Sequence, residues 1–311
     1  MKSFELVLKG HPDKVCDVVA DTLSRHDIFN ERTAIEVAWF NGKIFIGGEV
    51  SNYKKAIHDT EVLEIVKKKL LELGYNEPIS VEIHLNEQSA EIKNVVGSSG
   101  AGDNGIFIAG YHRHWTPIIR KLKEIADHIS INALKFNYRT DGKFIANFDV
   151  KNYTIKDFTL NIASYERSCK QVEFRNFVFE LLNKFFDIKE NQLFINPKGN
   201  WNKCGGFADS GVTGRKLACD NSLGLFRQGG GAFFGKDVSK ADYSVPVYLQ
   251  NKAQELVYEH NLTEIELHAY SIIGDEEIII RSADGSFSLV ESFEKIKDYA
   301  KNNPLYWFGL Y

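Results

Sequence analysis

The stretch FADSGVTGRKLACDNSLGLFRQGGGAFFGKDVSKAD, at residues 207–242, determines how the rest of the chain is interpreted. It combines a run of three glycines with several basic side chains and several carboxylates. Backbone N–H groups of glycines can approach an anion closely, lysine and arginine neutralise it, and carboxylates can hold a divalent cation. This combination suits a polyphosphate ligand.

A P-loop is one alternative for this stretch, because Gly230, Gly235 and Lys236 match most of the G-x-x-x-x-G-K-[ST] pattern. Asp237 then stands where the pattern needs a hydroxyl for Mg²⁺, and no apolar strand precedes the glycines. We therefore reject a P-loop nucleotidase. A glycine-rich surface loop with solvated lysines is the other alternative, and the motifs found elsewhere in the chain argue against it.

Composition indicates an ordinary globular protein. The 311 residues are 43% hydrophobic and 26% charged, and the formal net charge is −4. This charge argues against a general nucleic-acid binder. The 4 cysteines form no C-x-x-C pair, and neither a secretory signal nor an apolar segment of membrane-spanning length is present. We expect reduced thiols, a cytoplasmic location and no membrane partner.

The first third predicts a helix and a hairpin. GHPDK at residues 10–14 is typical of a helix start, which places His11 and Asp13 at an N-terminus that favours anions. Two alternating runs then flank Asn41-Gly42, the dipeptide best suited to a type I′ turn. Glu36 falls on a half-buried strand of this hairpin, where a carboxylate needs a partner, an ion or water.

The remaining two thirds repeat the same order of elements. The run at residues 135–150 predicts two strands around a turn at Asp141-Gly142, followed by another strand and an aromatic-rich helix. The last third predicts a helix, two strands and a final helix from Leu289 to about Lys301. Helix, paired strands and helix therefore recur three times.

The fold class predicted from this recurrence is α+β. We expect three pseudo-symmetric domains, each an antiparallel or mixed β-sheet covered by helices on one face. The expected ranges are 1–95, 96–203 and 204–311, with a possible crossing of the chain between domains near the N-terminus. The uncovered faces are expected to bury against one another or across a dimer interface.

Several motifs follow one another in a fixed order. They are GHPDK (10–14), GGE (47–49), GAGDNG (100–105), DGK (141–143), INPKG (195–199), DSGVTGRK (209–216) and GGGAFFGKDVSKAD (229–242). In these motifs and their spacing, the chain resembles the S-adenosylmethionine synthetases, also called methionine adenosyltransferases. The resemblance extends over most of the chain.

The resemblance implies three pseudo-symmetric α+β domains, with active sites between the subunits of a homodimer or a dimer of dimers. It also implies a reaction. The sulfur of L-methionine attacks C5′ of ATP, and tripolyphosphate leaves and is cut to pyrophosphate and phosphate before S-adenosylmethionine is released. Two Mg²⁺ ions and one K⁺ are the implied cofactors.

The resemblance assigns site residues by motif. The implied Mg²⁺ ligands are Asp13 and Asp242, and the implied K⁺ ligand is Glu36. Catalytic residues lining the triphosphate would be His11, Lys143, Arg215, Lys216 and Lys236. The nucleoside part of ATP would be contacted by Asp103, Asp141 and Trp201. Methionine would be held by Glu49, Asn94, Asp209 and Lys240.

Two alternatives share this fold. One is a regulatory subunit that binds ATP and methionine without turnover, which the retained triphosphate residues disfavour. The other is an adenosyltransferase that acts on a different nucleophile. The segment before GAGDNG is shorter than the gating loop of the family, and Asn94 stands near the position of a methionine-contacting glutamine, so this alternative stays open.

Overall fold

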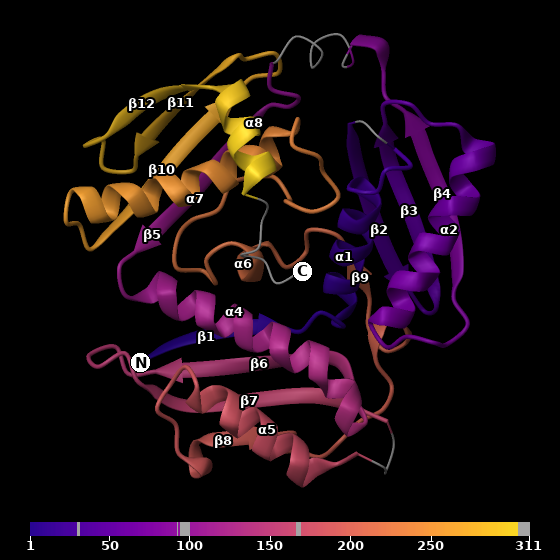
Figure 1. The fold of residues 1–311 in the computed structure, drawn as a ribbon, viewed down its shortest axis with the longest axis vertical. Coiled ribbons are helices and arrows are strands. Elements are labelled where there is room, and N and C mark those ends of the chain that lie inside the picture. Colours follow the sequence, from indigo (N-terminus) through magenta and orange to yellow (C-terminus); the bar gives the residue numbers. More distant parts are fainter. Residues whose placement is uncertain (30–31, 92, 94–99, 166–168, 304–311) are drawn as a thin grey trace.

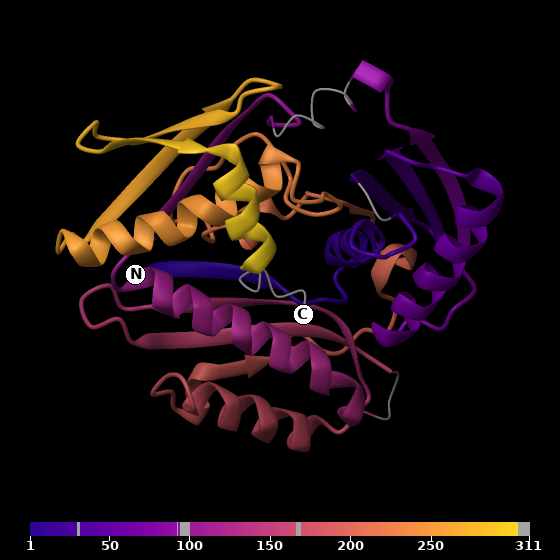
Figure 2. The ribbon, with the colours of Figure 1, turned by 45° about the horizontal axis from the view of Figure 1, so that its top comes forward.

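The computed structural model describes residues 1–303 except 30–31, 92, 94–99 and 166–168. Within this part of the chain the strands form three sheets, with the orders β1-β6-β7-β8, β4-β3-β2-β9 and β12-β11-β10-β5. Figure 1 shows the three sheets around a middle region that holds the short helix α6, and Figure 2 shows the same arrangement from a second direction.

The first sheet joins strands that lie far apart in the sequence. β1 and β7 both pair antiparallel with β6, and β8 runs parallel to β7. Its buried side chains pack against α4 and α5, whose apolar residues recur at helical spacing and give each helix one buried face. The elements are β1 (Lys2–Val7), α4 (Trp115–Asn132), η1 (Ala133–Phe136), β6 (Tyr138–Phe148), β7 (Ile155–Ser164), α5 (Gln171–Asn183), η3 (Glu190–Gln192) and β8 (Leu193–Ile195).

The second sheet contains the hairpin predicted from Asn41-Gly42. Both turn residues have positive φ, 42° and 77°, as a type I′ turn requires. The buried faces of β2 and β3 pack against α1 and α2, and β4 lies parallel to β3. The elements are α1 (Pro12–Ser24), β2 (Thr33–Phe40), β3 (Lys43–Val50), α2 (Lys55–Glu72), β4 (Ser80–Glu87), η4 (Gly205–Phe207) and β9 (Gly211–Val212). The short helix α6 (Leu217–Asp220) follows β9 in the chain and contacts β1 of the first sheet.

The third sheet is antiparallel throughout. Its core joins the buried side of the strands to α7 and α8. Figure 1 shows both helices, in orange and yellow, on the same side of the sheet. The elements are β5 (Gly105–His112), α7 (Ala241–Glu259), β10 (Glu264–Ser271), β11 (Glu277–Ser282), β12 (Ser288–Ser292) and α8 (Phe293–Asn302).

The predicted α+β class is confirmed, with mixed or antiparallel sheets that each pack against helices. The sheets do not follow the predicted ranges 1–95, 96–203 and 204–311, however. β1 belongs to the sheet of the middle range, β5 pairs with β10, and β9 pairs with β2. The domain borders remain a prediction, and each sheet takes at least one strand from outside its expected range.

Two local predictions were wrong. Asp141-Gly142 does not form a turn, because both residues lie inside the single strand β6. The pairing register of β6 with β7 shifts between Tyr138 and Gly142, so the Asp-Gly dipeptide coincides with an irregularity in the ladder. Leu289 does not begin the last helix either, because Ser288–Ser292 forms β12 and Ser292 caps α8 from Phe293.

We expect Leu122→Ala to destabilise the protein by about 2–5 kcal/mol, because it opens a cavity between α4 and the first sheet. Leu122 is fully buried in that core. Ile131→Ala is the matched control on the same helix, since Ile131 is 60% exposed. Urea denaturation would measure both changes, and equal effects of the two substitutions would contradict the assigned core.

Candidate functional site

The N-terminus of α1 is the first part of the site. Pro12 occupies the first helical turn, and Nδ1 of the His11 cap accepts a hydrogen bond from the Asp13 N–H at 3.3 Å. Since Nδ1 is an acceptor, the neutral ring carries its proton on Nε2. Burial, followed by the field of Lys216, lowers the pKa of His11 to about 4. His11 is therefore neutral at pH 7 and can donate from Nε2.

Asp13 joins this helix to the segment at residues 211–216. Its Oδ1 accepts a hydrogen bond from the Val212 N–H at 2.9 Å, and its Oδ2 forms an ion pair with Nζ of Lys216. Arg215 Nη1 lies 3.7 Å from Oδ1. Two cations from the loop and one carboxylate from the helix thus lie together, with Asp13 almost completely buried.

Three more predicted residues lie around this point. Lys143 and Asp209 both act electrostatically on His11, and Asp209 also acts on Asp141. Lys143 forms an exposed ion pair with Glu5 at 3.1 Å. We call the following set the first charge cluster: His11, Asp13, Asp141, Lys143, Asp209, Arg215 and Lys216. Its basic side chains surround a helix N-terminus, an arrangement suited to an anion.

Asp141 is held by a backbone contact. Its Oδ2 accepts a hydrogen bond from the Gly205 N–H at 2.7 Å. Burial raises the pKa of Asp141 to about 6, and the neighbouring Asp209 adds to this effect. The hydrogen bond from Gly205 opposes the rise only in part.

The second charge cluster consists of Glu36, Glu49, Lys236, Lys240 and Asp242. Lys236 Nζ lies 2.5 Å from Asp242 Oδ2, and Lys240 Nζ lies 2.7 Å from Glu49 Oε1. Burial would raise the pKa of Glu49, but hydrogen bonds from Lys240 and Gln88 lower it overall. The cluster therefore places a carboxylate, from Glu49, beside an ammonium group, from Lys240. These are the two charges that could bind a zwitterion.

The glycine run allows the second cluster to form. A Cβ on Gly231 would lie 2.0 Å from Asp242 Oδ1, so any larger residue would displace that carboxylate. Gly235 has φ +76°, and a Cβ there would lie 2.0 Å from the Ile35 carbonyl oxygen. Glycine is needed at Gly231 for close approach to the Asp242 carboxylate, and at Gly235 both for the positive φ and for close approach to the Ile35 carbonyl.

The two clusters lie near opposite ends of the same edge of strand β2. Gly211 and Val212 pair with its Ala38–Trp39 end, whereas Lys236 forms an isolated bridge with Ala34. No side-chain hydrogen bond or ion pair joins one cluster to the other in the described ranges. Each cluster is thus a partial site on its own.

Four predicted site residues differ from expectation or lie outside both clusters. β2 is half-buried as predicted, but Glu36 lies on its more exposed face, where desolvation by neighbouring protein atoms still raises its pKa. Trp201 is 38% exposed, and Asp103 is exposed next to β5. Asn94 lies outside the described residues.

The carboxylates of the two clusters supply only part of the ligands that the expected metal ions need. No group of three metal-ligating side chains lies together in the described part of the chain. Mg²⁺ commonly takes one or two carboxylates and completes its shell with water and phosphate oxygens. Asp13 and Asp242 each place one carboxylate beside a lysine. Glu36 would offer a K⁺ ion one carboxylate as a hard oxygen donor.

Sequence reasoning missed a buried network behind the first cluster, formed by Lys14, Asp17, Lys123 and Asp220. Lys14 Nζ lies 2.5 Å from Asp220 Oδ1 and 3.1 Å from Asp17 Oδ2. Burial alone would lower the pKa of Lys14, but the two carboxylates raise it overall, so Lys14 is charged. One signal was available, because Asp17 follows Asp13 by one helical turn and shares its face.

Among the residues that the structure describes, no helix is long and apolar enough to cross a membrane.

We expect Asp141→Asn to flatten the pH dependence of stability between about pH 4 and pH 6. An unfolded Asp ionises near 3.9, whereas Asp141 in the folded protein ionises near 6. The unfolded state therefore loses its proton first, and Asp141 lowers stability as the pH rises through this window, by up to about 3 kcal/mol. The substituted amide would keep an acceptor for the Gly205 N–H without ionising.

Urea denaturation at pH 4, 5, 6 and 7 would measure this change, with Asp103→Asn as an exposed carboxylate control. Parallel curves for the wild type and Asp141→Asn would contradict the buried environment of this side chain.

Comparisons with known proteins identify the family. The family model described as "S-adenosylmethionine synthetase, N-terminal domain" matches residues 1–100, and the corresponding C-terminal domain matches residues 204–302. The chain is 30% identical to the S-adenosylmethionine synthase of Mycoplasmopsis pulmonis, over 96% of this chain and 84% of that protein. It is also 30% identical to that of Acholeplasma laidlawii, over 82% of this chain and 74% of that protein.

A solved structure is similar as well. It is described as "Structure of an Unusual S-adenosylmethionine synthetase from Campylobacter jejuni", and it matches with a TM-score of 0.74 and 25% sequence identity. The match covers 99% of this chain and 87% of the other. Since sequence and fold agree over most of the chain, the protein belongs to the S-adenosylmethionine synthetase family.

Proposed function

We propose that this protein is a cytoplasmic methionine adenosyltransferase that makes S-adenosylmethionine from ATP and L-methionine. The observation that supports this most is the first charge cluster. Two cations of the 209–216 motif are held against Asp13 of GHPDK at a helix N-terminus, where a triphosphate can be neutralised.

The proposed reaction needs little activation of the nucleophile. The methionine sulfur is a thioether and attacks C5′ of the ribose directly, forming the S–C5′ bond as the C5′–O bond breaks. Negative charge then grows on the leaving tripolyphosphate. The work of the protein is to align sulfur with C5′ and to stabilise that charge.

The first cluster is proposed to stabilise the leaving group. Arg215 and Lys216 supply fixed positive charge, and neutral His11 donates a hydrogen bond from Nε2. Lys143 is exposed beside them and gains an anionic partner when the triphosphate binds. The same cluster is proposed to hold the tripolyphosphate while water cuts it to pyrophosphate and phosphate.

Asp13 and Asp242 are the residues proposed to hold two Mg²⁺ ions. Bound Mg²⁺ would neutralise phosphate oxygens as they gain charge. A carboxylate that binds Mg²⁺ would no longer need a lysine as its partner. Lys216 and Lys236 would then be free to contact phosphate. Glu36 is proposed to hold K⁺.

The second cluster is proposed to select methionine. Glu49 and Lys240 present opposite charges 2.7 Å apart, and they can separate to take the ammonium and carboxylate of an amino acid. Asp209 is proposed to add a second carboxylate for the ammonium group. Methionine binding by Asn94, and contacts of Asp103, Asp141 and Trp201 with the nucleoside, remain proposals from the family motifs.

Separation of the two clusters supports a homodimer or a dimer of dimers. Each cluster is paired internally within one chain, and both lie along the edge of β2 that pairs with Val212 and Lys236. We propose that the first cluster of one subunit and the second cluster of its partner enclose the same substrates.

Purified protein incubated with ATP, L-methionine, MgCl₂ and KCl should give equal amounts of S-adenosylmethionine, pyrophosphate and phosphate. Lys236→Ala should reduce kcat by about 100-fold or more, because one fixed cation at the leaving group is lost. Chromatography of the nucleosides and phosphate assays would measure both.

Phosphate release without the sulfonium product would instead indicate a hydrolase or a different nucleophile. ATP binding without any turnover would indicate a regulatory subunit. Lys252→Ala is the control, since Lys252 forms an exposed ion pair with Glu255 on α7.

Co-expression of Lys216→Ala and Lys236→Ala chains should restore about a quarter of wild-type activity. Half of randomly formed dimers combine both chains, and one of their two shared sites then carries both clusters intact. Each variant alone should be nearly inactive. Activity of the mixture no higher than that of the single variants would show that each site lies within one chain.

A further inference from the structure

Lys14 contacts both of the loops that carry the proposed phosphate ligands. Its Nζ lies 2.5 Å from Asp220, at the end of α6, the helix that Lys216 begins. The same Nζ lies 4.1 Å from the centre of the Phe234 ring, two residues before Lys236. Lys14 is only 4% exposed, so water screens these contacts little.

Helix α1 holds the 211–220 segment at several points. Asp13 accepts from the Val212 N–H at 2.9 Å, and Asp17 accepts from the Gly214 N–H at 2.7 Å. The Lys14–Asp220 ion pair then fixes the far end of the segment. Arg215 and Lys216 therefore lie between points of attachment to the same helix.

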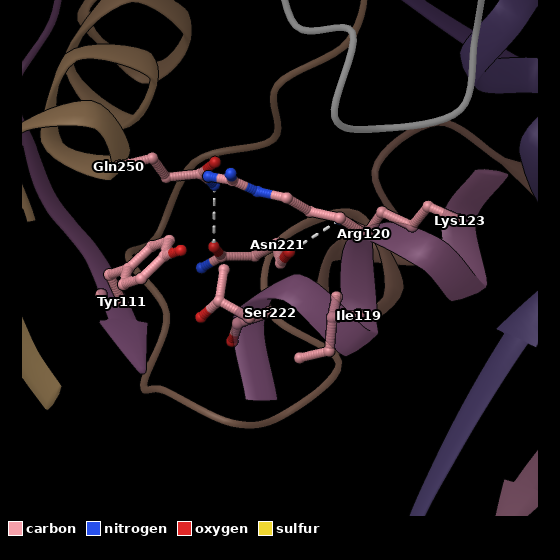
Figure 3. A pocket seen from close by; sticks show the side chains of 9 residues that line it. Tyr111, Ile119, Arg120, Lys123, Asn221, Ser222 and Gln250 are labelled. Carbon is pink, nitrogen blue, oxygen red and sulfur yellow. Dashed lines mark hydrogen bonds between the residues drawn. The ribbon is translucent and has the colours of Figure 1, made fainter. Parts of the chain in front are cut away.

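Asp220 is fixed from the opposite side as well. Lys123 of α4 donates from Nζ to the carbonyl oxygens of Asp220 and Asn221, at 2.6 and 2.8 Å. Figure 3 shows Lys123, Asn221 and Gln250 around the small pocket that this contact borders. Asp220 is thus held by a lysine on its carboxylate and by another on its backbone.

We propose that Lys14 is a positioning residue that, through Asp220 and Phe234, holds Arg215, Lys216 and Lys236 where the leaving triphosphate gains charge. This inference rests on the proposed function and adds a residue with no substrate contact of its own. Loss of the ion pair lets α6 shift. Because electrostatic stabilisation depends on donors that are fixed beforehand, a shift weakens it without removing any cation.

The test is the double variant Lys14→Met/Asp220→Asn. Removing Lys14 together with Asp220 leaves no buried ammonium or Asp220 carboxylate unpaired, and Asp17 keeps its hydrogen bond from the Gly214 N–H. Methionine fills the space of the lysine stem against Phe234. We expect the Kd for tripolyphosphate with MgCl₂, measured by calorimetry, to rise at least 10-fold. We also expect kcat to fall at least 10-fold, with the KM for methionine within twofold of wild type.

The matched control is Asp21→Asn/Arg25→Met, which removes an ion pair of 2.7 Å between Asp21 of the same helix and its C-cap residue Arg25. Its Kd for tripolyphosphate and its kcat should stay within twofold of wild type. Asp220→Asn alone keeps an acceptor for Lys14 and should give an intermediate Kd, which provides a second variant if the double variant does not fold.

Two results would overturn the proposal. One is a tripolyphosphate Kd and kcat of the double variant within twofold of wild type. The other is a fall in kcat accompanied by an equal rise in the KM for methionine and by a lower Tm. This result would assign the ion pair to general stability. If the wild type makes no S-adenosylmethionine, the proposed function fails, whereas the tripolyphosphate titration still decides the role of Lys14.

Discussion

The first turns of α1 determine how the rest of the molecule is assembled. Asp13, Lys14 and Asp17 bind three points of a segment about two hundred residues later in the chain, and all three are buried. Buried charges are costly unless each has a partner of matched geometry. The helix and the segment can therefore pack in only one relative position. That position determines where Arg215 and Lys216 of the segment lie.

The packing of the three sheets against helices determines which surfaces around α1 remain for ligands. Each sheet has one face packed against helices, and on β2 and β3 the residues of the opposite face are less buried, which leaves that face for ligands and other subunits. β2 is the clearest case, because its buried residues contact α1 while Glu36 points away from that core. A rigid scaffold thus presents two partial sites of complementary chemistry on its less covered side.

Local sequence signals predicted the elements better than the connections between them. Pro12 and the Asn41-Gly42 turn gave the correct helix start and hairpin because both depend on backbone sterics alone. The turn expected at Asp141-Gly142 failed because pairing with β1 and β7 overrode a local preference. Motif order identified the cations of the site, but the Lys14–Asp220 contact joins residues with no local relation, and no single-sequence pattern specifies such a pair.

Strand exchange between the three sheets also bears on how the chain folds during synthesis. β1 cannot complete its pairing until β6 has been made, and β5 must wait for β10, whose Ser271 pairs with Gly105. The growing chain therefore carries apolar strands with free edges for most of its translation, a state prone to misassociation. Folding dominated by such distant pairings is slow. Chaperone dependence and low yield of truncated fragments are the expected cost of a topology in which all three sheets join distant parts of the chain.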